Sequence, residues 1–82
     1  SQGGVSGPDA YPKHIFKVAC EHLASSIILA HNLPSGNLKP SEADKELTRR
    51  LTGAGKLLEI PVLDHLIFTD AGYLSFADEG ML

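Results

Sequence analysis

The feature that most constrains the fold is a short apolar run that leads through a turn-rich loop into a helical pattern. The run at residues 26–30 is too short and too β-branched for a separate helix, so it predicts a buried strand. Residues 31–40 are rich in proline, glycine, serine and asparagine, which predicts a loop. From Ser41, apolar residues recur every three or four positions as far as Leu58, which predicts an amphipathic helix. Such a strand–loop–helix unit can bring the end of the strand and the first helical turn into one pocket.

The rest of the chain completes an α/β pattern. Residues 12–24 predict a first helix, and Pro61 ends the second one. Residues 62–68 and 73–77 predict two strands joined as a hairpin. We therefore expect a mixed sheet with helices packed against it. The predicted core positions of the two helices are Ile15, Val18, Ala19 and Leu23, then Ala43, Leu47, Leu51, Ala54 and Leu58.

Composition excludes several classes of protein. The chain has 82 residues, enough for one small domain, and no apolar run near the ~20 residues of a membrane span. Its net charge of −3 does not support nucleic-acid binding, which normally needs a basic face. The single Cys20 excludes a disulfide framework and a thiolate zinc cluster, so a reducing, cytoplasmic setting is expected.

Candidate site residues flank the loop. His31 follows the predicted strand, and a histidine there is by itself more often a hydrogen-bonded structural residue than a ligand. Ser41 and Asp44 are three residues apart at the start of a helix, close to a capping box. The same carboxylate, at a helix N-terminus and near a histidine, is also placed to bind a metal, and both roles can coexist.

The segments HNLPSG at 31–36 and PSEAD at 40–44 carry a resemblance to a known family. Together with GGVSG at 3–7, IILAHN at 27–32, GKLLEIPVLDH at 55–65 and GYLSFADEGML at 72–82, they resemble the RadC-type bacterial proteins of the MPN/JAB metalloprotease superfamily. Leu33 stands where that family has its second histidine. The resemblance implies that residues 1–82 form one domain, the C-terminal two-thirds of the family's domain. Its N-terminal strands and a catalytic glutamate would then precede Ser1.

The resemblance also implies a function. In the family two histidines and an aspartate hold zinc, which activates a water for attack on an amide carbonyl, and a serine stabilises the oxyanion. His31 and Asp44 would then be metal ligands and Ser41 the catalytic serine. With Leu33 in place of a histidine, we expect weak zinc binding, a closed pocket and an impaired metallopeptidase- or isopeptidase-like hydrolase. RadC-type proteins also carry a DNA-repair label, which the acidic composition neither supports nor excludes.

A second function stays open: a non-catalytic module that binds a peptide or protein partner through the same groove. Asp64 and His65 are adjacent on a predicted strand, so at most one can face the pocket. That residue could hydrogen-bond His31, although a hydrogen bond at the edge of the core is the favoured interpretation. Because the predicted sheet is thin and has open edges, we also expect a homo-oligomer.

Overall fold

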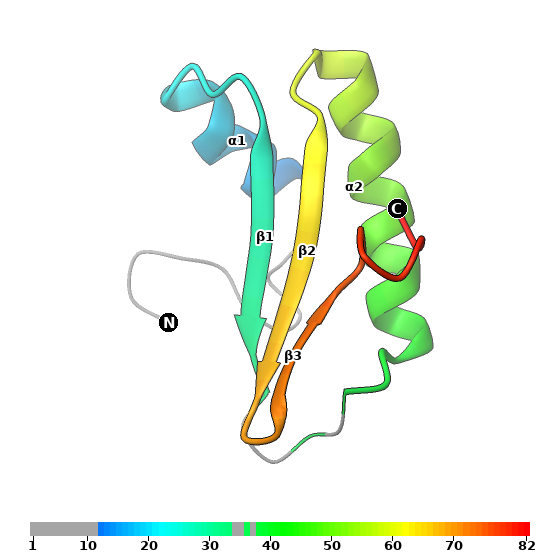
Figure 1. The fold of residues 1–82 in the computed structure, drawn as a ribbon. Helices are drawn as coiled ribbons and strands as arrows, with labels where there is room; N and C mark the ends of the chain where they lie inside the picture. The colour runs from blue at the N-terminus through cyan, green and yellow to red at the C-terminus, as the bar shows by residue number, and fades with distance from the viewer. Residues whose placement is uncertain (1–11, 34–35, 37) are drawn as a thin grey trace.

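Three strands and two helices make up the computed structural model, which describes residues 12–33, 36 and 38–82. In chain order they are α1 (Pro12–Glu21), β1 (Ile27–Asn32), α2 (Glu42–Leu58), β2 (Val62–Thr69) and β3 (Gly72–Ser75) (Figure 1). The sheet order is β1-β2-β3, with β1 parallel to β2 and β3 antiparallel to β2. The predicted α/β class with a mixed sheet is confirmed. Neither described helix is long and apolar enough to cross a membrane.

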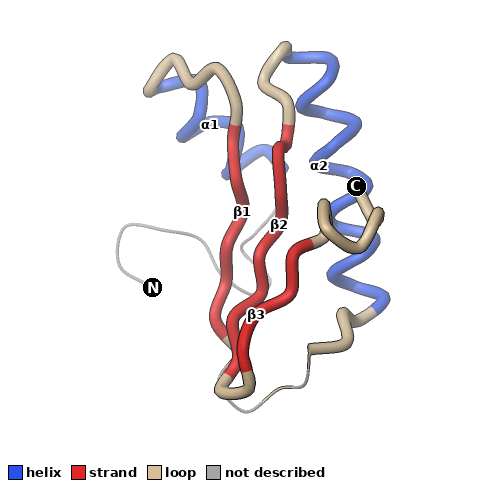
Figure 2. The backbone as a smooth tube through the Cα atoms, in the orientation of Figure 1, coloured by secondary structure: helices blue, strands red, loops and turns tan. Residues whose placement is uncertain are grey.

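Both helices pack into one core on one face of the sheet. Phe16 and Ala19 of α1 join Leu51 of α2 and Val62 of β2 in a buried cluster. Half-buried and exposed residues alternate along β1, as a half-buried sheet requires. In β2 this alternation is interrupted after Val62, where the register with β1 shifts. The opposite face carries Ile28, Phe68 and Tyr73, because Ile28 pairs with Asp64 and Tyr73 with Phe68 in the two ladders. Neither described helix covers that face (Figure 2). The helices and the sheet therefore form two layers.

Four of the predicted core positions are wrong. Val18, Leu23, Ala43 and Leu58 are exposed, whereas the other predicted positions pack in or against the core. Helix α1 ends at Glu21, and Leu23 turns the chain with φ near +50°, so that side chain leaves the helix face. Ala43 and Leu58 lie in the first and last turns of α2, outside the span of its buried residues from Thr48 to Gly55.

The strand boundaries also differ from the prediction in a way that matters for the site. Strand β1 runs two residues further than predicted, so His31 lies inside the ladder opposite Ile67 of β2. Helix α2 runs back against the direction of β1, and its N-terminus therefore lies near the carboxyl end of that strand (Figure 1). Strand β3 spans Gly72–Ser75, shorter than the predicted 73–77.

Candidate metal centre

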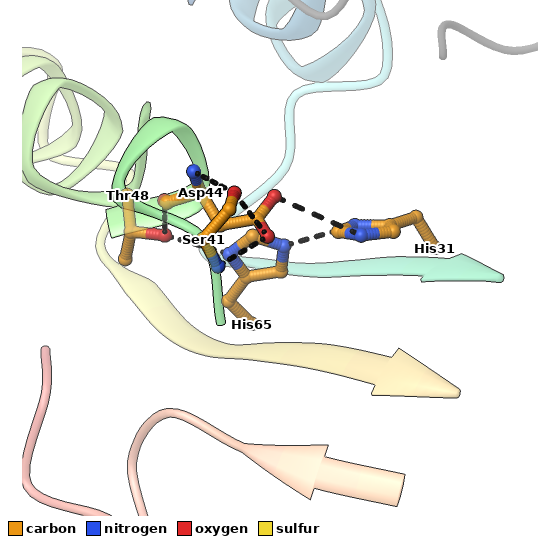
Figure 3. Close-up of polar contacts among 5 residues, drawn as sticks. All are labelled: His31, Ser41, Asp44, Thr48 and His65. Carbon is orange, nitrogen blue, oxygen red and sulfur yellow. Dashed lines mark hydrogen bonds and ion pairs between the residues drawn. The ribbon is translucent and has the colours of Figure 1, made fainter. Parts of the chain in front are cut away.

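His31 and Asp44 meet where β1 ends and α2 begins. His31 is fixed by its place in the parallel ladder, and Asp44 by its place in the first turn of α2. The Nε2 atom of His31 lies 3.9 Å from Oδ1 of Asp44 (Figure 3). Their side chains are 35% and 21% exposed, so solvent and small ions reach the pair. The strand–loop–helix prediction that these two residues share a pocket is consistent with this geometry.

Ser41 uses its polar atoms to cap the helix and to orient Asp44. The Asp44 amide donates to Ser41 Oγ at 3.0 Å, and the Ser41 amide donates to Asp44 Oδ2 at 3.1 Å, which completes a capping box. The Ser41 hydroxyl also donates to Oδ2 at 2.8 Å. Both hydrogen bonds to the carboxylate engage Oδ2, and Oδ1 is the oxygen turned toward His31 (Figure 3). One carboxylate thus caps a helix and faces a histidine.

Behind His31 lies His65, a residue of β2 that is only 1% exposed. Its Nε2 is 3.2 Å from Nδ1 of His31, and its Nδ1 is 2.6 Å from Oγ1 of Thr48 on α2. The ring of Phe76 stacks on His65 at 4.6 Å between centroids, with the planes 18° apart. The pKa of His65 lies below its ordinary value of 6.5. Burial lowers this pKa most and nearby His31 lowers it further, whereas Asp44 and Asp64 raise it by less.

His65 therefore contacts the pocket directly, and the favoured interpretation of a hydrogen bond at the core edge was wrong. Asp64 points to the other face of β2, as the alternation of strand side chains requires, and accepts a hydrogen bond from Ser75 at 2.6 Å. Sequence reasoning missed Thr48. Its only signal was a position four residues after Asp44 on the buried face of α2.

Leu33 does not fill a core position. Its side chain is 43% exposed, and its amide donates to the Phe68 carbonyl at 2.7 Å, just beyond the end of β1. The expected closed pocket is therefore wrong, since Leu33, His31 and Asp44 all keep exposed surface. Pro34 and Ser35, which belong to the same motif, lie outside the described residues.

The donor set at this pocket fits zinc in part. Donor atoms that share one tetrahedral zinc ion lie roughly 3.4 Å apart, given metal–ligand bonds near 2.0–2.2 Å. The 3.9 Å between His31 Nε2 and Asp44 Oδ1 is about half an ångström wider than that spacing. Within the described part of the chain, however, no cluster of three histidine, cysteine, aspartate or glutamate side chains could hold a metal ion. Among the described residues, His31 and Asp44 are therefore two candidate ligands without a third.

Comparison with known proteins establishes the family. The model of the RadC-like JAB domain matches residues 1–81. The chain belongs to the RadC-like JAB domain family. Among curated proteins, a UPF0758 protein of Flavobacterium johnsoniae is 46% identical over 81 residues, which cover 99% of this chain and 35% of that protein. A UPF0758 protein of Porphyromonas gingivalis is 54% identical over 83 residues, which cover 100% of this chain and 37% of the relative.

The RadC-like assignment confirms the resemblance found in the sequence, but it assigns no activity to this chain. The chain spans about a third of the length of the curated relatives it matches. Their shared name, UPF0758 protein, states no activity.

Proposed function

We propose that this RadC-like JAB domain carries a zinc-binding pocket of the metallohydrolase type, formed by His31 and Asp44 and weakened by Leu33. The observation that carries the proposal is the approach of His31 Nε2 to Asp44 Oδ1 at 3.9 Å, at the partly exposed junction of a strand and a helix N-terminus. Neutral imidazole and carboxylate are standard zinc ligands. A zinc ion held there would supply Lewis-acid activation of a water molecule or an amide carbonyl.

The chain's own residues prepare this pocket in two ways. Ser41 holds Oδ2 of Asp44 through its amide and its hydroxyl, and thereby leaves Oδ1 for a ligand role. Hydrogen-bonded support of a ligating carboxylate is the usual arrangement around a metal. Ser41 also lies close enough to the pair to contact a substrate oxygen if its hydroxyl turns away from Asp44, which is the catalytic role we propose for it.

The proposed substrate is a peptide or an isopeptide, cleaved at its amide bond. This class rests on family membership and on the partly exposed polar pair of His31 and Asp44. The proposal includes no direct contact with DNA, because the chain has a net charge of −3. A DNA-repair setting for the longer proteins is compatible with a substrate that is itself a protein.

Metal binding by variants of residue 33 tests the proposal. After dialysis, the unaltered chain is expected to retain well under one zinc per chain. Leu33→His should bind zinc at least about 100-fold more tightly, because a third imidazole joins the existing pair. Leu33→Gln is the matched control, since it removes the same apolar side chain without adding an imidazole. Calorimetric titration with zinc checks both variants.

Two results would contradict the proposal. If Leu33→His gains no more affinity than Leu33→Gln, residue 33 does not point into a pocket shared by His31 and Asp44. If the unaltered chain retains one zinc per chain, Leu33 does not weaken the pocket and another side chain completes the ligand set.

A second candidate, a non-catalytic peptide-binding module, is favoured by the exposure of Leu33. This side chain is 43% exposed just beyond the end of β1, so it supplies apolar surface where the family has an imidazole. Peptide binding that persists in the presence of a chelator and weakens in Leu33→Gln would support this candidate. Binding that requires zinc would support the hydrolase-type pocket.

A further inference from the structure

A continuous series of polar groups leads from helix α2 through the core to His31. The Thr48 hydroxyl donates to the Asp44 carbonyl at 2.7 Å, and the same oxygen lies 2.6 Å from His65 Nδ1. His65 Nε2 then lies 3.2 Å from His31 Nδ1 (Figure 3). Thr48 and His65 are each 1% exposed, so bulk solvent does not reach the contact between them. The series starts and ends at the two residues of the proposed metal pocket.

The end of the series at Asp44 fixes the direction of every hydrogen bond in it. A carbonyl oxygen only accepts, so Thr48 gives its single hydroxyl hydrogen to Asp44. The Thr48 oxygen must therefore accept a hydrogen from Nδ1 of His65. A neutral imidazole has one N–H group, which leaves Nε2 of His65 with a lone pair. That lone pair can only accept, so His31 must donate from its own Nδ1.

The surroundings of His65 favour the neutral ring that these hydrogen-bond directions require. One face of the ring stacks on Phe76, and its two nitrogens contact Thr48 and His31. Within the described part of the chain, no carboxylate is hydrogen-bonded to the ring, and a buried charge without such a partner is costly. With a neutral ring, all polar atoms of the series are satisfied, in agreement with the finding that no buried side-chain donor or acceptor among the described residues is unpaired.

We propose that Thr48 and His65 are positioning residues that hold His31 in the Nδ1–H tautomer, so that its Nε2 lone pair faces Asp44. The distance of 3.9 Å between Nε2 and Asp44 Oδ1 agrees with two acceptors that have no hydrogen between them. A lone pair and a carboxylate oxygen attract a cation placed between them. The use of this tautomer for zinc rests on the proposed function, whereas the tautomer itself is a property of the metal-free chain.

Long-range proton–nitrogen NMR of the imidazole rings tests the proposal directly, because the nitrogen shifts distinguish the two tautomers. The unaltered chain is measured at pH 8 with a chelator present. We expect both His31 and His65 as the Nδ1–H tautomer. Detection of His31 as Nε2–H, or as an average of both forms, would overturn the proposal without recourse to any variant.

Paired variants of Thr48 separate positioning from a purely structural role. Thr48→Val keeps the shape of the side chain but removes the acceptor for His65, so both rings should move toward the Nε2–H form. Thr48→Ser retains the hydroxyl and should restore the Nδ1–H form of both rings. If His31 keeps its tautomer in Thr48→Val while the amide spectrum shows a folded chain, Thr48 does not act on it and the proposal fails.

Zinc titration of the same variants links the tautomer to the proposed function. Loss of a supporting hydrogen bond behind a metal-binding histidine typically costs about 10–100-fold in metal affinity. We expect a loss of this size in Thr48→Val and its recovery in Thr48→Ser. A switch of tautomer with unchanged zinc affinity would support the positioning role of Thr48 and His65 and contradict the proposed zinc pocket. The reverse result, a loss of zinc affinity with an unchanged tautomer, would contradict the positioning role of Thr48 and His65 but not the proposed zinc pocket.

Discussion

Asp64 shows how one side chain can stabilise the fold on the face of β2 that lies away from the pocket. Its carboxylate accepts hydrogen bonds from the Ser75 hydroxyl at 2.6 Å, the Ala77 amide at 2.9 Å and the His65 amide at 2.7 Å. Burial raises the pKa of Asp64, but these hydrogen bonds together outweigh it, so the pKa lies below its ordinary value of 3.8. The folded chain therefore holds the Asp64 proton less tightly than the unfolded chain does.

The sign of the resulting pH dependence is set by this lowered pKa. The stabilisation is complete above the unfolded pKa of Asp64 and is lost as pH falls through the lower, folded pKa. We expect Asp64→Asn to lower the free energy of unfolding at pH 7 by about 1–2 kcal/mol, because hydrogen bonds to a charged acceptor are lost. Urea denaturation between pH 7 and pH 3 should show a shallower pH dependence in this variant.

A matched charge removal provides the control for Asp64. Asp78→Asn removes one negative charge from an exposed residue nearby. This variant should keep the acid sensitivity of the unaltered chain. Equal pH profiles for Asp64→Asn and the unaltered chain would show that the three hydrogen bonds do not favour the charged carboxylate.

At the scale of a single element, α2 contains two glycines with opposite environments. A methyl group built on Gly53 would meet no atom within 4 Å, whereas one built on Gly55 would lie 2.5 Å from the Ile60 carbonyl oxygen. Gly53→Ala should raise the free energy of unfolding by about 0.5–1 kcal/mol, because alanine loses less backbone freedom in a helix. Gly55→Ala should lower it by about 1–3 kcal/mol through overpacking.

Thermal denaturation of the two glycine variants checks this prediction, and each serves as the control for the other. The substitution and the helix are the same, so the difference between the melting temperatures isolates the contact with Ile60. Equal stability of the two variants would mean that the turn after α2 shifts freely to admit a methyl group.

At the scale of the whole molecule, we predict self-association through the sheet face that neither described helix covers. Ile28, Phe68 and Tyr73 lie there with 57%, 42% and 58% of their surfaces exposed, although each is large and apolar. Within the described residues, β1 pairs with β2 alone and is an outer strand, and such strands readily pair with another chain. A homodimer or larger oligomer would cover this apolar surface.

Light scattering at micromolar concentration tests the predicted self-association. Phe68→Lys should weaken it at least about tenfold, since burial of a phenylalanine contributes roughly 1.5–3 kcal/mol. Leu57→Lys is the control, because this residue is 88% exposed on α2 and does not lie on the sheet face. A single species of 8.7 kDa with cooperative unfolding would contradict the prediction.

Much of the fold and part of the site could be predicted from local sequence. The run at 26–30, the loop and the helical spacing indicated the strand–loop–helix unit, and Pro61 indicated the end of α2. Ser41 and Asp44 were identified as a capping box because both partners lie within one helical turn. Errors occurred where the outcome depended on neighbours: β1 extends through His31 because β2 supplies a ladder partner there.

The sequence by itself determined which chemical groups flank the loop and which residues begin the second helix, because these depend on spacings of a few residues. Only the tertiary structure decided what lies behind His31. His65 is 34 residues further along the chain, and it reaches His31 because parallel pairing sets Leu29 beside His65. Thr48 joins them because α2 packs on that face of the sheet. Strand register and helix packing are set by burial of the whole core, which no short segment contains.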